Sequence, residues 1–348
     1  MKIAQVAPLF ESVPPHGYGG TERVVSYLTE ELVRQGHQVT LFASGDSVTQ
    51  ARLVQACARS LRLDQACVDQ LAHHMVLLEQ VFRQARAFDL LHFHIDYVHF
   101  PLAVRQPIPT VTTLHGRLDV PDLVPLYHMF PSLPVVSISD AQRAPLPSVN
   151  WLGTVYHGLP EDLYTFRETP GTYLAFLGRI SPEKGVEQAI AIAQQAGLPL
   201  KIAAKVDRAD RAYFQAVVQP LLQHSLVEYV GEVGGDTKDA FLGQALALLF
   251  PIAWPEPFGL VIIEAMACGT PVIAYPRGSV PEVLEDGVTG WIVEGIEEAV
   301  QAVARVPALS RARCRQVFEE RFSASRMAQD YVQLYRQLLA PRTGRAAA

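Results

Sequence analysis

Two glutamates stand in an otherwise apolar stretch, WPEPFGLVIIEAMACG, which covers residues 254–269. If the segment from Phe258 to Cys268 is a helix that ends at Gly269, then Glu264 lies in a helix that is apolar nearly all round and therefore buried. An ionised carboxylate in such a place is costly unless something donates hydrogen bonds to it. A ligand diol such as a ribose would satisfy both oxygens, and an internal arginine or a backbone amide is an equal alternative.

Glu256 precedes this expected helix, between two prolines that stiffen the loop and remove amide donors. The amides of Phe258, Gly259 and Leu260 are expected at the N-terminus of the helix, where free N–H groups and the helix dipole favour a phosphate or a sugar oxygen. Because two anions repel, a glutamate beside such a site is suited to hold sugar hydroxyls rather than phosphate. A purely structural loop acid is the alternative.

Two basic residues follow a predicted strand in FLGRISPEKG, residues 176–185. Gly178 permits close approach of the backbone, and Arg179 and Lys184 flank a turn from which both could point into one cleft. A guanidinium and an ammonium together can neutralise a diphosphate as it leaves, whereas each alone is commonly a solvated surface charge.

Glycines and histidines mark the first half of the chain. In HGYGGTER, Gly19 and Gly20 allow a tight loop before a helix, although the segment matches neither the dinucleotide fingerprint nor a Walker loop. His94 and His115 each follow a predicted strand, and we expect both to project from the carboxyl edge of a sheet into a cleft. His92 and His94 would share one face of a strand, but no third ligand stands at a matching spacing, so no metal site is predicted.

Composition narrows the class of protein. The 348 residues are 49% hydrophobic and 18% charged with a net charge of -6, which is typical of a folded chain of two domains and argues against a general nucleic-acid binder. The longest apolar run, ALALLFPIAW, is too short to span a bilayer, and the N-terminus lacks a secretory apolar region, so a cytoplasmic protein is expected. The four cysteines show no C-x-x-C pairing, which fits reduced thiols.

Short apolar runs alternate with longer amphipathic segments, which is the pattern of βαβ units and a parallel sheet. The pattern breaks at residues 157–171, a segment rich in turn formers, so we predict an α/β protein with domains over residues 1–160 and 165–322. An amphipathic helix over 323–340 and a disordered tail over 341–348 follow. The predicted strands cover residues 2–7, 38–43, 89–94, 110–115, 135–139, 172–178, 199–204, 226–231, 246–250 and 271–275, and the clearest helices cover 21–35 and 183–196.

The motifs taken in order resemble glycosyltransferase family 4. They are GGTE near the N-terminus, TLHG in the first domain, GRISPEKG at the start of the second, and EPFGLVIIEAMACGTPVIA near its end. The run PIAWPEPFGL is most similar to the branch that includes the avilamycin-pathway transferase. The resemblance covers residues 1 to about 339. It implies a GT-B fold of two Rossmann-like, doubly wound parallel-sheet domains facing a central cleft, with the last helix crossing back to the first domain.

The same resemblance implies transfer of a hexose from a nucleotide-diphosphate sugar, with retention of anomeric configuration and without a metal or other cofactor. Carried over residue by residue, Arg179 and Lys184 would bind the diphosphate, Glu256 the hydroxyls of the donor sugar, and His115 the donor sugar at the reaction centre. The other expected donor contacts are Gly19, Gly20, Gly178, Phe258, Gly259, Leu260, the ribose ligand Glu264, and Lys205, which would reach the diphosphate or alter the base pocket. In HGLP, His157 stands where the family commonly has asparagine.

UDP-glucose is the expected donor and GDP-mannose the next, with no residue that separates them. The hydroxyl acceptor is unknown: a soluble one and a lipid-linked one with peripheral membrane contact are both open, because no lysine-rich amphipathic face marks the first domain. Two alternative functions are a nucleotide-sugar 2-epimerase on the same fold and a non-catalytic sugar-nucleotide-binding paralogue. The first would lack the block with glutamates eight residues apart, and the second would be expected to have lost Arg179, Lys184 or Glu256.

Overall fold

The computed structural model describes residues 1–340, so the tail predicted to be disordered lies outside the described residues. The chain divides into two compact units. Unit 1 comprises residues 1–138, 143–158 and the segment from 324 onward, and unit 2 comprises residues 139–142 and 159–323. Each unit is described by itself below.

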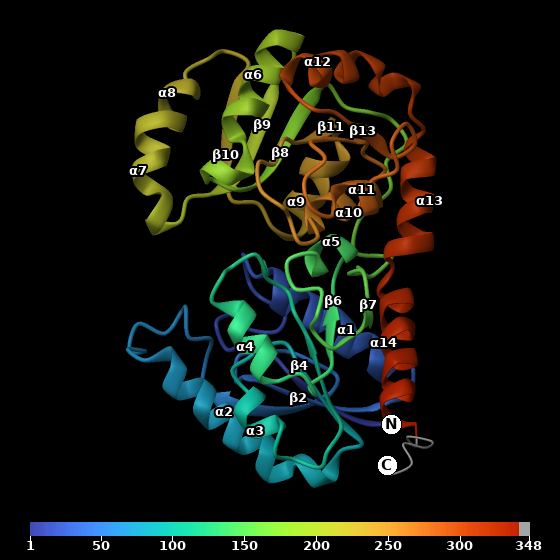
Figure 1. Ribbon diagram of the computed structural model, residues 1–348. Coiled ribbons are helices and arrows are strands. Elements are labelled where there is room, and N and C mark those ends of the chain that lie inside the picture. The colour runs from blue at the N-terminus through green and yellow to red at the C-terminus, as the bar shows by residue number, and fades with distance from the viewer. Residues whose placement is uncertain (341–348) are drawn as a thin grey trace. The chain divides into compact units, whose positions relative to one another are not determined.

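Unit 1 is built on a seven-stranded parallel sheet in the order β3-β2-β1-β4-β5-β6-β7 (Figure 1). Its strands are β1 (Lys2–Val6), β2 (Gln38–Ser44), β3 (Arg52–Cys57), β4 (Leu90–Phe93), β5 (Thr110–Thr113), β6 (Val135–Ser137) and β7 (Trp151–Thr154). Its helices are α1 (Gly20–Arg34), α2 (Gln70–Gln84), α3 (Phe100–Ala103), α4 (Leu123–Met129) and α14 (Ala324–Leu339), and α5 (Asp140–Arg143) lies where the chain passes between the units.

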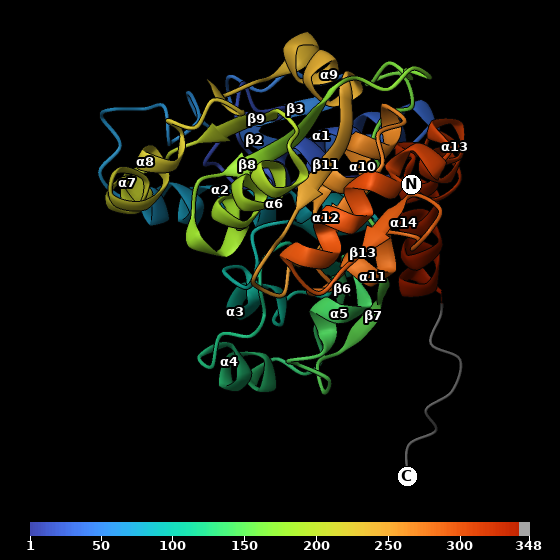
Figure 2. The same ribbon diagram turned by 90° about the horizontal axis from the view of Figure 1, so that it is seen from above.

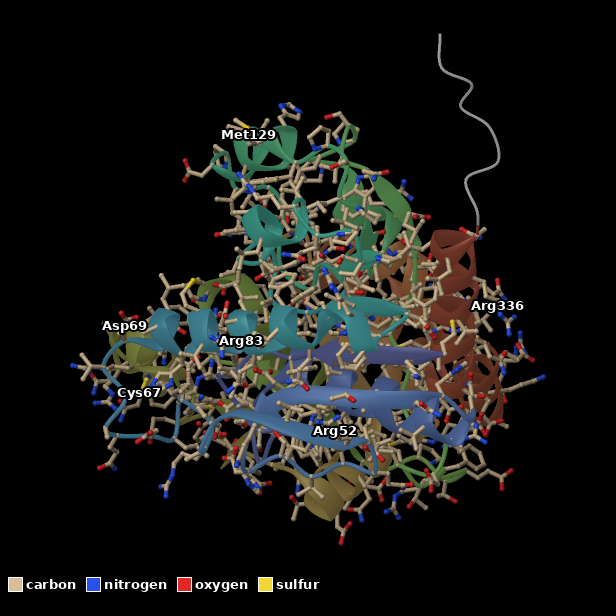
Figure 3. The ribbon with its side chains drawn as sticks, turned by 90° about the horizontal axis from the view of Figure 1, so that it is seen from below. Arg52, Cys67, Asp69, Arg83, Met129 and Arg336 are labelled. Atoms are coloured by element: carbon tan, nitrogen blue, oxygen red, sulfur yellow. The ribbon has the colours of Figure 1, made fainter. Side chains whose placement is uncertain are left out.

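Residue alternation along β1 and β4 separates the two faces of this sheet. Ala4 and Val6 pack with the buried side of α2, while Ala7 packs with Val25 of α1 on the other face. The helix α14 lies beside α1. In Figure 3 the start of α2 is marked by Asp69, whose carboxylate accepts hydrogen bonds from two amides of the first turn.

Unit 2 is built on a six-stranded parallel sheet in the order β10-β9-β8-β11-β12-β13. Its strands are β8 (Tyr173–Arg179), β9 (Leu200–Lys205), β10 (Val227–Gly231), β11 (Ala245–Phe250), β12 (Val272–Ala274) and β13 (Gly290–Ile292). Its helices are α6 (Val186–Ala196), α7 (Arg211–Tyr213), α8 (Gln219–Leu221), α9 (Gly235–Gly243), α10 (Leu260–Ala267), α11 (Val280–Val283), α12 (Ile296–Arg305) and α13 (Arg311–Phe322).

The helices of unit 2 form two pairs. The first pair, α6 and α12, lies side by side (Figure 2). It shares one apolar core with alternate residues of the central strands, among them Phe176 and Leu249. The second pair is α10 and α13, which pack against each other and contribute no residue to that core. This face of the sheet is therefore buried, and the sequence fills it with large apolar residues such as Phe176 and Leu249 and with smaller ones such as Ala204.

The predicted α/β class with parallel sheets is confirmed. All ten predicted strands exist, whereas β3, β7 and β13 were not predicted. The strand β3 has only half-buried and exposed residues, and β13 has three residues that begin with a glycine, so neither shows a strong apolar pattern. Gly36 follows α1 with a φ of 84°, the left-handed conformation in which a glycine commonly ends a helix. Within residues 1–340, none of the helices is long and apolar enough to cross a membrane.

Candidate functional site

The stretch with the two glutamates forms α10, and the helix is shorter than predicted. It begins at Leu260, because Gly259 before it has a φ of 80° and so lies in the left-handed region. The amides of Phe258 and Gly259 therefore precede the helix, and that of Leu260 is its first. Gly269 ends the segment with a φ of 81°, as predicted.

Glu264 lies in this helix with a relative exposure of 3%, so the predicted burial is confirmed. Its Oε1 accepts a hydrogen bond of 2.5 Å from Nζ of Lys238, which comes from α9. The sequence left open an internal arginine or backbone amide as the partner of Glu264. The partner in the structure is instead a lysine. Within residues 1–340, Oε1 is the only oxygen of Glu264 in a hydrogen bond, so Oε2 retains capacity to accept one.

Glu256 lies in the loop after β11 and accepts two hydrogen bonds at one oxygen. Nζ of Lys184 lies 2.5 Å from Oε2 of Glu256, and Nε1 of Trp254 donates to the same oxygen over 2.9 Å. The Lys184 ammonium also lies 5.1 Å from the centroid of the Trp254 ring, within the range of a cation–π contact. An ammonium, an indole and a carboxylate therefore hold one another in place.

Two glycines explain how the loops that carry these side chains come together. Gly185, with a φ of 75°, follows Lys184, and a Cβ there would lie 2.1 Å from the carbonyl oxygen of Pro251. Gly278, with a φ of 59°, would place a Cβ 2.3 Å from the carbonyl oxygen of Glu256. Both positions thus require a residue without a side chain, so that backbone can pack directly against backbone.

Arg179 and Lys205 lie side by side at the carboxyl edge of the sheet, because they are register partners on β8 and β9. Arg179 contacts three carboxylates, and Lys205 lies 3.0 Å from one of them, Asp207. Burial alone would raise the pKa of Glu183, but hydrogen bonds from its backbone, from Ser181 and from Arg179 hold this pKa below its usual value. The partners of Arg179 are Glu183 at 2.5 Å, Asp210 at 3.5 Å and Asp207 at 3.8 Å.

Space near this edge is open at Gly178, where a Cβ would meet no atom within 4 Å. Arg179 and Lys184, which could point into one cleft, pair with different carboxylates in the structure. Lys184 binds Glu256, and Arg179 binds the group around Asp207. Both nevertheless extend from the loop that joins β8 to α6.

In unit 1, the predicted glycine loop leads into α1. Gly19 precedes the helix and Gly20 is its first residue. A side-chain nitrogen of Arg23 donates to the carbonyl oxygen of Gly17 over 2.8 Å, so the helix also holds the loop in front of it. A Cβ at Gly19 would lie 2.8 Å from Cβ of Pro15, so the chain packs tightly there.

The histidines of unit 1 form a buried cluster. His94 does not project into an open cleft as predicted: it is 2% exposed, and its Nδ1 lies 2.9 Å from Nε2 of His115. His115 is the partly exposed member, and its ring stacks on that of His157 with centroids 5.3 Å apart. Burial lowers the pKa of His115 to about 3 and that of His94 well below the ordinary value, so both rings are neutral at pH 7.

His92 and His94 do share one face of the chain at β4, with ring centroids 4.1 Å apart. Both nitrogens of His92 are used in hydrogen bonds, Nδ1 with Tyr335 and Nε2 with Thr113. Across residues 1–340, no group of three or more His, Cys, Asp or Glu is arranged to hold a metal ion.

Sequence reasoning missed Lys238 and Trp254, the contacts of the two glutamates. A signal was available for the first, because the chain has 24 arginines but only five lysines. Three of these five, Lys184, Lys205 and Lys238, bind carboxylates at the candidate site. A rare residue type placed three times at one site is informative, whereas the tryptophan gave no such signal.

Comparison with known proteins supports the resemblance to glycosyltransferase family 4. Residues 18–144 match the family described as Glycosyltransferase Family 4, and residues 165–317 match the one described as Glycosyl transferases group 1. An uncharacterised glycosyltransferase of Methanocaldococcus jannaschii is 26% identical over 337 residues, which cover 84% of this chain and 85% of that protein.

Solved structures agree. AviGT4, a glycosyltransferase involved in avilamycin A biosynthesis, is 25% identical with a TM-score of 0.72 and coverage of 98% of each chain. Alr3699/HepE of Anabaena, solved with UDP and glucose, is 20% identical with a TM-score of 0.72 over 96% of this chain and 98% of that one. The two parallel-sheet units thus correspond to the GT-B fold. The chain belongs to glycosyltransferase family 4 and is a glycosyltransferase.

Proposed function

We propose that the protein transfers a hexose from a nucleoside-diphosphate sugar to a hydroxyl acceptor, with retention of anomeric configuration and without a metal or other cofactor. One observation carries the proposal. Unit 2 gathers Arg179, Lys184, Glu256 and Glu264 with the N-terminal end of α10, at the carboxyl edge of its sheet or in the loops and helix that follow its strands. This edge is where open α/β sheets bind their ligands.

The diphosphate of the donor is proposed to lie against the cations and the amides at the start of α10. Arg179 and Lys184 offset its negative charge, and Lys205 lies beside Arg179 at the same edge. The amides of Phe258, Gly259 and Leu260 add donors at the positive end of the helix dipole. The open space at Gly178 leaves room for the ligand against the backbone.

The ribose is proposed to bind Glu264. Lys238 satisfies Oε1 and neutralises the buried charge, which removes much of the cost of keeping a carboxylate there. The remaining oxygen can accept from a ribose hydroxyl. In this proposal the internal partner and the ligand are not exclusive, because each uses a different part of the same carboxylate.

Leaving-group stabilisation is the proposed catalytic device. The bond from the sugar to the diphosphate breaks and a bond to the acceptor oxygen forms on the same face, while the hydroxyl proton passes to the departing diphosphate oxygen. Arg179, Lys184 and the helix amides stabilise the charge that develops on that oxygen. Glu256 binds hydroxyls of the donor sugar, and Glu264 is engaged by Lys238 and ribose, so the two do not form the carboxylate pair of a glycoside hydrolase.

From unit 1 we propose that His115 contacts the donor sugar and that the loop with Gly19 and Gly20 offers amides to the substrate. UDP-glucose is the first expected donor and GDP-mannose the second. The UDP and glucose in the Anabaena structure support this order, although that protein shares only 20% of its residues with this chain.

Thermal unfolding with UDP, GDP and ADP sugars tests the donor site. A ligand at 100 times its Kd stabilises a protein by about 2.7 kcal/mol, so the correct donor is expected to raise Tm by several degrees. Glu264→Ala is expected to abolish the shift. Glu228→Ala removes a carboxylate that is 59% exposed and pairs with Lys201, and serves as the matched control with an unchanged shift. If no nucleotide sugar moves Tm, the proposed donor site is wrong.

A further inference from the structure

A chain of hydrogen bonds in unit 1 joins the C-terminal helix to His115. It begins at Tyr335 of α14, whose hydroxyl lies 2.7 Å from Nδ1 of His92 and 3.2 Å from Nε2 of Gln5. Oε1 of Gln5 lies 2.8 Å from Nε2 of His94, and Nδ1 of His94 lies 2.9 Å from Nε2 of His115. A second branch leads from Nε2 of His92 to Thr113 over 2.8 Å.

Strand pairing puts these side chains on one face. Gln5 of β1 is the register partner of His92 of β4, and in the next strand the residue beside His92 is Val111. Because alternate residues share a face, His94 and His115 lie on the same side of the sheet as Gln5 and His92. Figure 3 shows Arg336 pointing outward from α14, whereas Tyr335, one residue earlier, is fully buried.

The positions of the hydrogens in this chain of hydrogen bonds follow from one group that can only accept, Oε1 of Gln5. A carboxamide oxygen cannot donate, so Nε2 of His94 must carry a hydrogen that it donates to Oε1 of Gln5. His94 is neutral, because burial lowers its pKa well below the ordinary value, and its Nδ1 therefore has no hydrogen. That nitrogen can only accept, so Nε2 of His115 must be the donor of the bond between the two rings.

The other ring nitrogen of His115, Nδ1, then carries no hydrogen and presents a lone pair. Within residues 1–340, Nδ1 of His115 is buried and has no hydrogen-bond partner. A buried polar atom without a partner is costly, so this nitrogen gains from any hydrogen-bond donor that reaches it. A lone pair accepts from a hydroxyl and repels phosphate or carboxylate oxygens.

We propose that Gln5 and His94 are positioning residues that hold His115 as the Nε2–H tautomer, so that its Nδ1 accepts a hydrogen bond from a hydroxyl of the sugar substrate. The proposal rests on the proposed function in one respect, which is that His115 meets the sugar. It adds that His115 acts as an acceptor and contacts no phosphate.

The tautomer can be observed without activity. Long-range proton–nitrogen NMR on ligand-free protein labelled with ¹⁵N-histidine reports which ring nitrogen carries hydrogen, and a spectrum of His115→Ala assigns the signal. A protonated Nε2 and a bare Nδ1 are expected for His115 at pH 7.5. A protonated Nδ1 in the unaltered protein overturns the proposal, whether or not the variants at Gln5 fold.

Two variants of equal length at one position test the role of Gln5. Gln5→Glu keeps an acceptor facing His94 and is expected to retain the tautomer of His115. Gln5→Met removes the acceptor, so the His115 signal is expected to shift toward the other tautomer or a mixture. In Gln5→Met, kcat is expected to fall about tenfold, the cost of one lost hydrogen bond, while KM for the donor stays the same.

His99→Gln is the matched control. His99 is also buried, but it hydrogen-bonds Thr112 and stacks on Phe93, so it is not part of the hydrogen-bond chain from Tyr335 to His115. Its replacement is expected to leave the His115 signal unchanged. An unchanged His115 signal in Gln5→Met would overturn the role of Gln5. UDP binding by thermal shift, measured in parallel, separates this failure from a failure of the proposed donor site, since Gln5 and His94 lie in unit 1 and the proposed nucleotide contacts in unit 2.

Discussion

Lys238→Met is expected to destabilise unit 2 by about 3 kcal/mol, because it leaves Glu264 buried without its counter-charge. The carboxylate side chain is 4% exposed and the ammonium side chain 18% exposed, and they lie 2.5 Å apart. Breaking a buried pair costs about 3 to 5 kcal/mol, and the partial exposure of the lysine places this pair at the lower end. For a unit of this size the loss corresponds to a fall in Tm of about 6 to 12 °C.

The double variant Lys238→Met/Glu264→Leu decides whether this reasoning is correct. Because it removes both charges, it is expected to recover most of the lost stability in urea or thermal unfolding. UDP is expected to stabilise the single variant, which keeps Glu264, but not the double one. Lys201→Met is the matched control, since Lys201 and Glu228 are 35% and 59% exposed, and its cost is expected to stay below about 1 kcal/mol. A double variant as unstable as the single one would refute the ion-pair argument, and a UDP shift retained in the double variant would refute the ribose role.

Three further outcomes are expected. Lys184→Met removes a cation proposed to act on the leaving diphosphate, so kcat should fall about 10² to 10³-fold in an initial-rate assay, and a loss below threefold would contradict the role. Gly278→Ala should lower kcat/KM while Tm changes little, because its Cβ would meet the backbone of Glu256 at 2.3 Å and displace that carboxylate. Activity equal to that of the unaltered protein would show that the loop adjusts without displacing Glu256. Burial lowers the pKa of His99 and of His115 from 6.5 to about 3, so between these values the unfolded chain binds protons that the folded chain does not. Stability should therefore be full above about pH 6.5 and fall by up to about 1.4 kcal/mol per pH unit for each such histidine below it, and equal urea midpoints at pH 7.5 and 5 would contradict this.

Much of the fold followed from local pattern. Apolar runs predicted the central strands, because a parallel strand buried on both faces must be apolar along its length. Short or half-exposed strands such as β13 and β3 carry too little of that pattern to be recognised. The position of Arg179 followed too, since it comes directly after a predicted strand whose carboxyl end lies at the edge of the sheet. That of Glu256 followed from its place in the loop before a predicted helix.

The partners of these side chains could not be predicted. Lys238 lies 26 residues before Glu264, on a different crossover of the sheet, and no local pattern links the two. The same holds for His94, which was expected to project into a cleft and is instead buried and bonded to Gln5, 89 residues away. Which long side chain reaches which carboxylate depends on how neighbouring loops pack, and this is a tertiary property.

The ion pairs of unit 2 bear on how a diphosphate could be bound. Each of Arg179, Lys184, Lys205 and Lys238 lies within 4 Å of a carboxylate, so the cations do not form a region of uncompensated positive charge. Long side chains lose rotamer freedom when they are ordered, and here their pairing already orders them in the folded protein. An arriving diphosphate would replace carboxylates as a partner of cations that are already positioned, and a displaced glutamate would be left to accept from sugar hydroxyls. Affinity in such a site would depend on the exchange of matched hydrogen bonds more than on net charge, and the proposed recognition of phosphate and of sugar would therefore be coupled through the same ion pairs.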